Sequence, residues 1–322
     1  MKILFVGDVH ATADSLDECG RLVDFALKTA KDEKVDRICY SGDLFHNHAI
    51  LSLYVVDFWL EAFKKRTVPT VVLVGNHDRP GNNSDTISAL DVYQDVEVVN
   101  SYYVKDKVLY VGYQSNHEDF LNICNTFSEY GTVICHQTIS GSTYDNGFYA
   151  KDGISPDLIP QKHVIAGHIH RGQEFGKVWY PGAPRWRTAS DTNTDRAIWV
   201  IEFDQQGVPI SRKPFDTSSV CKRILSFEDR AESPADLSNI GNASVIVDVY
   251  GSVDYVDRRK KELKDLGVRV RTFPDQKVTS GIKESEGISI AFSKYVNRFT
   301  PKNGTVKSKL WEIAMDRIGW TP

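Results

Sequence analysis

The sequence lacks the cysteine patterns that hold a structural zinc ion or build a disulfide framework. Its five cysteines are scattered over 322 residues, and no two of them stand in a Cys-X-X-Cys spacing. An odd number of scattered cysteines is typical of free thiols in a reducing compartment. We therefore expect a cytoplasmic protein.

Long apolar runs are also missing. No stretch approaches the roughly 18 apolar residues that a membrane-spanning helix needs. The first residues, MKILFVGDVH, do not have the form of a signal peptide, because their short apolar segment ends in an acidic residue. The sequence therefore predicts no membrane partner.

An excess of positive charge is absent as well. Lys and Arg number 39 against 43 for Asp and Glu, which gives a formal net charge of -4. Nucleic-acid-binding proteins are usually basic, so this balance argues mildly against DNA unless bound cations or a partner supply the positive field. The composition is otherwise that of a globular protein, 41% hydrophobic and 25% charged, and the length suggests about two domains.

The first two thirds of the chain alternate short apolar runs with helical patterns. Runs at 2–7, 35–40 and 70–74 are separated by amphipathic stretches, the first of which opens with Ser15 and Glu18 in the spacing of a capping box. This rhythm predicts parallel strands joined by crossover helices. The further predicted elements are helices at 51–66 and 117–130 and strands at 96–100, 108–112, 132–135, 164–166, 178–180 and 197–203.

The character of the sequence changes near residue 217. Two apolar runs, 243–249 and 268–273, flank a helical pattern at 253–266 and predict a small βαβ unit. A polar stretch then reads as a linker, and two amphipathic helical patterns follow it. We predict four segments: a first domain at 1–216, a small α/β cap domain at 217–273, a linker at 274–287 and a helical module at 288–322.

Polar side chains follow five of the predicted strands. In open α/β sheets the carboxyl ends of the strands form the ligand-binding edge, so we expect these side chains to meet. A single histidine there is usually a turn residue, but a whole cluster without partners would be costly to bury, and two divalent cations would remove that cost. Imidazole and oxygen donors without thiolates favour manganese, iron or zinc. The positions are Asp8, His10, Asp43, His46, Asn76, His77, His136, His168 and His170.

Five motifs carry a family resemblance. The segments GDVH (7–10), GDLF (42–45), GNHD (75–78), CH (135–136) and GHIH (167–170) resemble, in order and spacing, the motifs of calcineurin-like metallophosphoesterases. The resemblance covers about the first 200 residues. It implies an α/β fold with a two-layered β-sandwich core flanked by helices, to which this chain adds the small α/β cap domain and C-terminal helices.

The resemblance also implies roles for the strand-end residues. One metal ion would take Asp8, His10 and His170, the other would take Asn76, His136 and His168, and Asp43 would bridge them. Such a pair serves in-line displacement at phosphorus, and we expect two divalent ions with Mn²⁺ preferred and Mg²⁺ possible. His77 would be catalytic. Its neighbour Asp78 would either orient His77 or cap the next turn.

Two further segments narrow the resemblance. GDLFH, which ends at His46, and YPGAPRWRTASD (180–191) resemble the SbcD-type DNA nucleases, the family of the meiotic recombination nuclease, although Ala183 departs from the usual serine. In that family a histidine at the position of His46 helps to shape the reaction on DNA. A polar residue at the start of a helix is the competing interpretation of His46.

The SbcD resemblance implies a metal-dependent DNA nuclease subunit for recombination, repair or replication. It would act as an exonuclease on duplex ends and as an endonuclease on single strands. Its partners would be DNA, an SbcC-type coiled-coil ATPase held by the C-terminal helices, and a second copy of the nuclease domain. The chain is short for the family and similar to bacteriophage versions, which implies the cytoplasm of a prokaryotic or phage-infected cell.

Several alternatives stay open at this point. The same fold also serves small-molecule phosphodiesterases and phosphatases, and a non-catalytic scaffold is a more remote reading. A Gly- and Tyr-rich loop at 140–153 could reach substrate or simply be solvated. The charged segment DRRKKELK (257–264) could meet the DNA backbone or form a solvated helix face.

Overall fold

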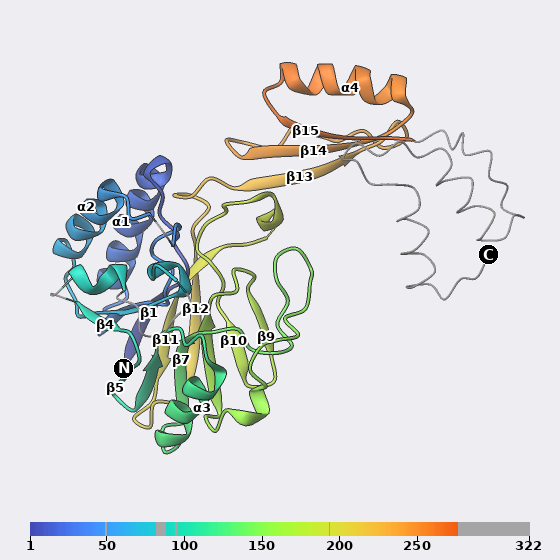
Figure 1. Cartoon of the computed structure of the whole chain (residues 1–322). Helices are drawn as coiled ribbons and strands as arrows, with labels where there is room; N and C mark the ends of the chain where they lie inside the picture. Colours follow the sequence, from blue (N-terminus) through green and yellow to red (C-terminus); the bar gives the residue numbers. More distant parts are fainter. Residues whose placement is uncertain (49, 82–87, 94–95, 193, 276–322) are drawn as a thin grey trace, which may run out of the picture.

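The computed structural model describes residues 1–48, 50–81, 88–93, 96–192 and 194–275 (Figure 1). Two six-stranded sheets pack face to face, helices cover their outer faces, and a separate three-stranded sheet stands beyond them. This is the predicted α/β sandwich. Nearly all of the predicted linker at 274–287 and the whole helical module at 288–322 lie outside the described residues. None of the described helices is long and apolar enough to cross a membrane.

The first sheet has the order β12-β11-β1-β2-β3-β4, and its last four strands are parallel. Helices α1 (Leu16–Asp32) and α2 (Leu53–Lys64) cover its outer face. Strands that are buried on both faces need continuous apolar runs. This explains why the apolar runs at 2–7, 35–40 and 70–74 predicted the first three strands of this sheet. The strands are β1 (Lys2–Val6), β2 (Arg37–Tyr40), β3 (Thr70–Leu73), β4 (Glu97–Val99), β11 (Ala197–Phe203) and β12 (Pro209–Asp216).

The second sheet has the order β5-β6-β7-β8-β10-β9, with β6, β7, β8 and β10 parallel. Helix α3 (His117–Thr126) lies beside it. The strands are β5 (Tyr102–Lys105), β6 (Val108–Val111), β7 (Thr132–His136), β8 (His163–Gly167), β9 (Gln173–Phe175) and β10 (Val178–Tyr180). Short 3-10 turns occur at Ala13–Ser15, Asn76–Asp78, Ala89–Val92, Pro156–Leu158 and Ala189–Asp191.

The core between the sheets follows from the two-residue period of a strand. In β1, Ile3 and Phe5 point toward the second sheet, whereas Leu4 and Val6 point toward the helices. Ile134 of β7 lies in the same inter-sheet cluster as Ile3 and Phe5. This two-sided burial fixes the register of the sheet, and with it the place where each strand ends.

Some local predictions were wrong. Helix α1 does begin after Ser15, but the Ser15 side chain makes no capping hydrogen bond to it, and its hydroxyl donates to the Thr12 carbonyl instead (3.2 Å). Glu18 instead pairs with the buried Arg185 guanidinium (3.0 Å). Leaving that buried charge unpaired would cost more than losing a helix cap. The helix expected at 117–130 ends at Thr126.

The third sheet consists of parallel strands β13 (Ile224–Asp229), β14 (Ser244–Gly251) and β15 (Arg269–Pro274), with helix α4 (Val253–Asp265) packed on one side. In Figure 1 it stands above the sandwich with α4 on the far side. The sequence predicted β14, α4 and β15 but missed β13. The division into a first domain and a cap domain at residue 217 stays a prediction.

Candidate metal centre

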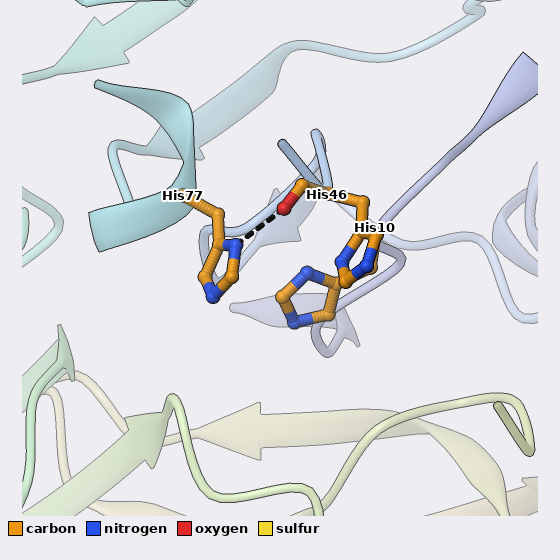
Figure 2. A group of neighbouring side chains, drawn as sticks. All are labelled: His10, His46 and His77. Carbon is orange, nitrogen blue, oxygen red and sulfur yellow. Dashed lines mark hydrogen bonds between the residues drawn. The ribbon is translucent and has the colours of Figure 1, made fainter. Parts of the chain in front are cut away.

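The predicted site residues gather at the carboxyl ends of the central strands. His10, His46 and His77 can each offer a donor atom within 4.8 Å of the others, and so can Asp43, His136 and His168. Figure 2 shows the first group, with the His77 imidazole turned toward the backbone carbonyl of His46. His136, expected just after a strand, is the last residue of β7.

Asp43 stands between two groups of donor atoms. Its Oδ2 lies 3.4 Å from His10 Nε2 and 3.4 Å from His136 Nε2. Its Oδ1 accepts a hydrogen bond from the His77 backbone N–H (2.8 Å). One carboxylate oxygen is thereby fixed by the fold, and the other is left facing both groups, as a bridging ligand requires.

The two groups are built from imidazoles and one amide. On one side His10 Nε2 lies 3.0 Å from His170 Nε2. On the other, Asn76 Oδ1 lies 2.9 Å from His168 Nδ1 and 3.2 Å from His136 Nε2. The structure thus brings together the residues that the family resemblance assigned to each ion, Asp8 excepted, and their roles as ligands stay a prediction.

The spacing of these atoms fits divalent cations. Two ligands that are each about 2.1 Å from one ion lie about 3.0 Å apart at a right angle and about 3.4 Å apart at the tetrahedral angle. The separations between facing donors fall largely in this range, from 2.9 to 3.4 Å. The donor set of carboxylates, imidazoles and an amide oxygen, without thiolates, suits Mn²⁺, Fe²⁺ or Zn²⁺.

Asp8 is placed differently from the other predicted ligands. Its two carboxylate oxygens accept from the His168 backbone N–H (3.2 and 3.1 Å), and Oδ1 lies 3.3 Å from His136 Nδ1. These contacts are with the second group, whereas the motif resemblance assigned Asp8 to the ion held by His10 and His170. That assignment stays a prediction.

The backbone is strained at three of the residues whose side chains carry the candidate metal-binding atoms. His10, Asp43 and His168 adopt positive φ angles of 48, 52 and 85°. Residues other than glycine rarely adopt this conformation, and each instance costs on the order of 1–2 kcal/mol. A Cβ at Gly75 would come within 2.1 Å of Asp43 Oδ1, so the glycine of the GNHD motif is required by the close approach of Asp43.

Burial sets the protonation of the imidazoles. It lowers the pKa of His168 to about 3 and that of His170 to about 4, and it holds that of His10 well below its usual value. These three rings are therefore neutral at neutral pH, which is the form that binds metal.

Burial favours the protonated form of both carboxylates of the centre, but their net pKa shifts have opposite signs. Burial would raise the pKa of Asp43, but His136 and His10 outweigh it and hold the pKa well below the ordinary carboxyl value. For Asp8 burial prevails and raises the pKa to about 7. Burial lowers the pKa of His136, but Asp43 and Asp8 prevail and raise it to about 9. A bound cation would replace the His136 proton beside these carboxylates.

His77 and His46 occupy one side of the centre. His77 Nδ1 lies 2.5 Å from the His46 carbonyl oxygen, and its ring centroid is 4.6 Å from that of His10. The Arg187 guanidinium donates to His46 Nδ1 (2.8 Å). Burial, followed by the positive charge of Arg187, lowers the pKa of His46 to about 4. His46 is thus a neutral ring beside a fixed cation.

Asp78 braces the loops and does not contact the His77 ring. Its buried carboxylate accepts from the Phe45 backbone N–H (3.0 Å) and from the Gly75 backbone N–H (2.9 Å). It caps the turn Asn76–Asp78 and ties that turn to the segment that carries Asp43. Asp78 therefore caps the turn that it ends, rather than the next turn that one of the two alternatives proposed.

Sequence reasoning missed four residues around the centre. Arg187 lies beside His46, and Asp145 lies with His170 and Asp191 in a third potential donor group. Tyr113 stacks its ring on His168, with centroids 5.9 Å apart. Tyr113 follows strand β6, so the strand-end rule could have found it. Arg187 and Asp145 sit in long loops that carry no such signal.

Comparison with known proteins agrees with this site. Residues 1–172 match the calcineurin-like phosphoesterases, which is more than half of the chain and includes the five motifs. The chain belongs to this family. It is accordingly a hydrolase of phosphoester bonds, of a kind that uses divalent metals, and the clusters of Asp and His described above could bind them.

Individual relatives have low sequence identity to this chain. The chain is 25% identical over 312 residues to the DNA double-strand break repair protein Mre11 of Nanoarchaeum equitans, covering 81% of this chain and 80% of that protein. It is 24% identical to the protein of the same name from Archaeoglobus fulgidus, over 57% of this chain and 50% of that one. The crystal structure of TT1561 of Thermus thermophilus covers 67% of this chain and 98% of its own at 15% identity, with a TM-score of 0.40.

Proposed function

We propose that this chain is a metal-dependent DNA nuclease subunit that cleaves duplex ends as an exonuclease and single strands as an endonuclease. The observation that carries the proposal is the convergence of Asp43 with the two donor groups on one point. The similarity to proteins named for DNA double-strand break repair supports DNA as the substrate.

Cationic side chains beside the centre favour a polyanionic substrate. A cleft of about 550 Å³ lies between Arg187–Thr188 and the third sheet, and Arg187, Lys222 and Arg269 are among the residues that line it. Two bound divalent ions would add about four positive charges nearby. This local field resolves the conflict between a DNA substrate and a net charge of -4.

The chemistry of the chain's own groups follows from their contacts. Bound ions would supply charge for the phosphate oxygens and acidify a water molecule. A carbonyl oxygen only accepts, so His77 Nδ1 carries the proton in its bond to the His46 carbonyl, and Nε2 is left free. Burial lowers the pKa of His77, so Nε2 gains a proton only as a phosphate binds beside it, and it would then stabilise the charge on phosphorus or protonate the leaving oxygen. Arg187 keeps His46 in place beside the same substrate.

Partner proteins form a second part of the proposal. Exposed Ile50, Leu51, Leu53 and Tyr54 form a patch at the start of α2, and we propose that a second copy of the nuclease domain covers it. An SbcC-type ATPase would be held by the predicted helices at 288–322, which lie outside the described residues. Helix α4 carries Arg258, Lys260, Lys261 and Lys264, but it lies on the side of the third sheet away from the sandwich, so these cations would not line the cleft next to the centre.

The test is an assay of the purified full chain with Mn²⁺ on three substrates: linear duplex DNA, circular single-stranded DNA and a chromogenic phosphodiester. We expect cleavage of all three and metal analysis near two ions per chain, with Asp43→Asn as the inactive control. Hydrolysis of the chromogenic diester alone would contradict the nuclease proposal and favour a small-molecule phosphodiesterase. No hydrolysis by metal-loaded protein would favour a non-catalytic scaffold.

A further inference from the structure

Three aromatic side chains are exposed on the loop at 140–153, between β7 and β8. Tyr144, Phe148 and Tyr149 have exposed fractions of 36, 71 and 69%. Isolated exposed aromatics are common, but three within six residues form an apolar patch that needs an explanation. We call Tyr144, Phe148 and Tyr149 the aromatic tip.

The loop that carries the tip is firmly held. The Thr143 backbone exchanges two hydrogen bonds of 2.8 Å with the Gln173 side chain, and the Ala150 N–H donates to the Ser142 carbonyl (2.8 Å). Across the tip, the Tyr144 N–H donates to the Phe148 carbonyl (2.9 Å). Phe148 is therefore presented on a closed hairpin, so little conformational entropy would be lost when a ligand binds it.

The same loop is joined to the metal centre. Asp145, one residue after Tyr144, lies 3.9 Å from His170 Nδ1 and 3.4 Å from Arg196 Nη2. The inner side of the loop thus reaches His170 of the centre, and its outer side carries the exposed rings.

We propose that the aromatic tip is a stacking platform for unpaired bases next to the phosphate held at the metal centre. This inference rests on the proposed nuclease function. A substrate strand that places its phosphate at the donors must send its neighbouring bases across the adjoining surface, and flat exposed rings bind such bases without sequence preference. Bases in an intact duplex are already stacked on each other, so the platform would favour single strands and frayed ends.

The occupant follows from the position of the tip and its chemistry. The rings are uncharged and lie on a preorganised hairpin whose Asp145 is 3.9 Å from His170 of the site where the phosphodiester would be cut. A protein partner would also cover apolar rings. If that were their role, removing a ring would leave the binding of a short single strand unchanged, so single-strand binding by variants of the tip separates these two occupants.

The probe is a short oligothymidylate containing one 2-aminopurine, whose fluorescence falls when the base stacks. With the full-length His77→Ser protein as background, which should keep its metal ions while cutting the probe slowly, Phe148→Ala should weaken binding about tenfold, and Tyr149→Ala should have a similar effect. Phe148→Leu keeps an apolar side chain without a flat ring and should behave like Phe148→Ala. Phe148→Trp should restore both binding and quenching.

The matched control is Tyr102→Ala, because Tyr102 is an aromatic residue with an exposed fraction of 52%, within the range of the aromatic tip, and lies on β5 at the opposite edge of the second sheet from β9. It should leave probe binding unchanged. Wild-type affinity in Phe148→Ala, or full binding by Phe148→Leu, would overturn the stacking platform. The probe reports binding without cleavage. Failure of the nuclease assay would therefore contradict the proposed function, whereas the binding measurements test the stacking platform separately.

Discussion

Two buried polar clusters, one at the metal centre and one in the third sheet, are built in opposite ways. In the third sheet, buried Asp229 accepts from Tyr255 Oη (2.6 Å), from Arg259 Nη2 (2.7 Å) and from the Ala235 backbone N–H (3.0 Å). Every contact there joins a donor to an acceptor. At the metal centre, imidazole nitrogens face one another and face acceptor oxygens, and three of the residues hold positive φ angles.

The contrast separates a structural cluster from a functional one. A buried carboxylate that is fully hydrogen-bonded stabilises its fold and needs nothing more. Imidazole nitrogens that face one another and a strained backbone persist only where the surrounding fold enforces them, and together they indicate the place where a bound cation would supply charge. The same chain thus shows what a site of each kind looks like, and variants at each cluster should behave differently.

The largest expected effect on hydrolysis comes from Asp43→Asn. Among the described residues, Asp43 lies between the two donor groups, with its Oδ2 3.4 Å from His10 Nε2 and 3.4 Å from His136 Nε2. We expect turnover of the chromogenic diester to fall by more than about 10³-fold, because loss of a bridging carboxylate affects both ions. Metal analysis should show fewer than two ions per chain. Near-normal turnover with full metal content would contradict the bridging role.

His77→Ser should have the next largest effect. The His77 ring lies beside the donors, and its Nε2 is free to contact substrate. Groups that stabilise transition-state charge typically contribute on the order of 10²–10³ in rate, so kcat should fall by about that factor with metal content unchanged. Loss of an ion would make His77 a ligand instead.

The control for this variant is His48→Ser. The exposed His48 ring stacks on His77 with centroids 3.9 Å apart, so the control removes a neighbouring imidazole of the same type. It should change kcat only a few-fold if catalysis depends on His77 itself.

The fold could be read from the sequence where strands are buried on both faces. The apolar runs of β1, β3, β10 and β11 were located to within a residue or two. Strands β5, β9, β12 and β13 were missed, and β12, with sequence PISRKPFD, shows why. It is an edge strand, mostly exposed, and edge strands carry charged residues and proline that disguise their periodicity. Family resemblance, rather than periodicity, indicated two packed layers.

The site was predictable to the same extent as the strands that lead into it. The strand-end rule placed His136 and Asn76 together although they are 60 residues apart, and they lie 3.2 Å from each other. Arg187 and Asp145 were not predicted because they lie in loops. A loop has no hydrophobic periodicity from which the direction of its side chains could be inferred. Asp8 shows a further limit, since its position at the end of β1 did not say which donor group it would contact.

His46→Ser should affect DNA more than a small diester. The bond from His77 reaches the backbone carbonyl of His46, so this substitution leaves His77 in place and removes only the ring held by Arg187. We expect cleavage of single-stranded DNA to fall about tenfold, which corresponds to the loss of one or two hydrogen bonds to substrate. Hydrolysis of the chromogenic diester should fall less. Equal effects on both substrates would remove the DNA-specific role.

A matched control for His46→Ser is His163→Ser. His163 is a half-buried histidine at the first residue of β8, at the far end of that strand from the centre. It should leave both rates unchanged, which would show that the effect at His46 is not a general response to losing an imidazole.

The smallest effect on hydrolysis is expected for Asp229→Asn, because its cluster is structural. Burial would raise the pKa of Asp229, but the hydrogen bonds from Arg259 and Tyr255 outweigh it and hold the pKa below the ordinary carboxyl value. A folded-state pKa below the unfolded value contributes stability above the unfolded pKa, and that contribution is lost as pH falls through the folded pKa. At neutral pH we expect the variant to lose about 2 kcal/mol, the value of hydrogen bonds to a buried charge.

Denaturant unfolding of both proteins at several pH values measures this difference. It should stay constant from neutral pH down to about 4 and shrink only below that, where the wild-type carboxylate becomes protonated. Asp248→Asn provides the control within the same sheet, because its partner Arg271 is more than one third exposed and the pair should contribute less than about 1 kcal/mol. Chromogenic diester hydrolysis by Asp229→Asn should match the wild type. If it instead fell as steeply as in the metal-centre variants, the two clusters would not differ in kind, and full hydrogen bonding would not distinguish a structural cluster from a functional one in this protein.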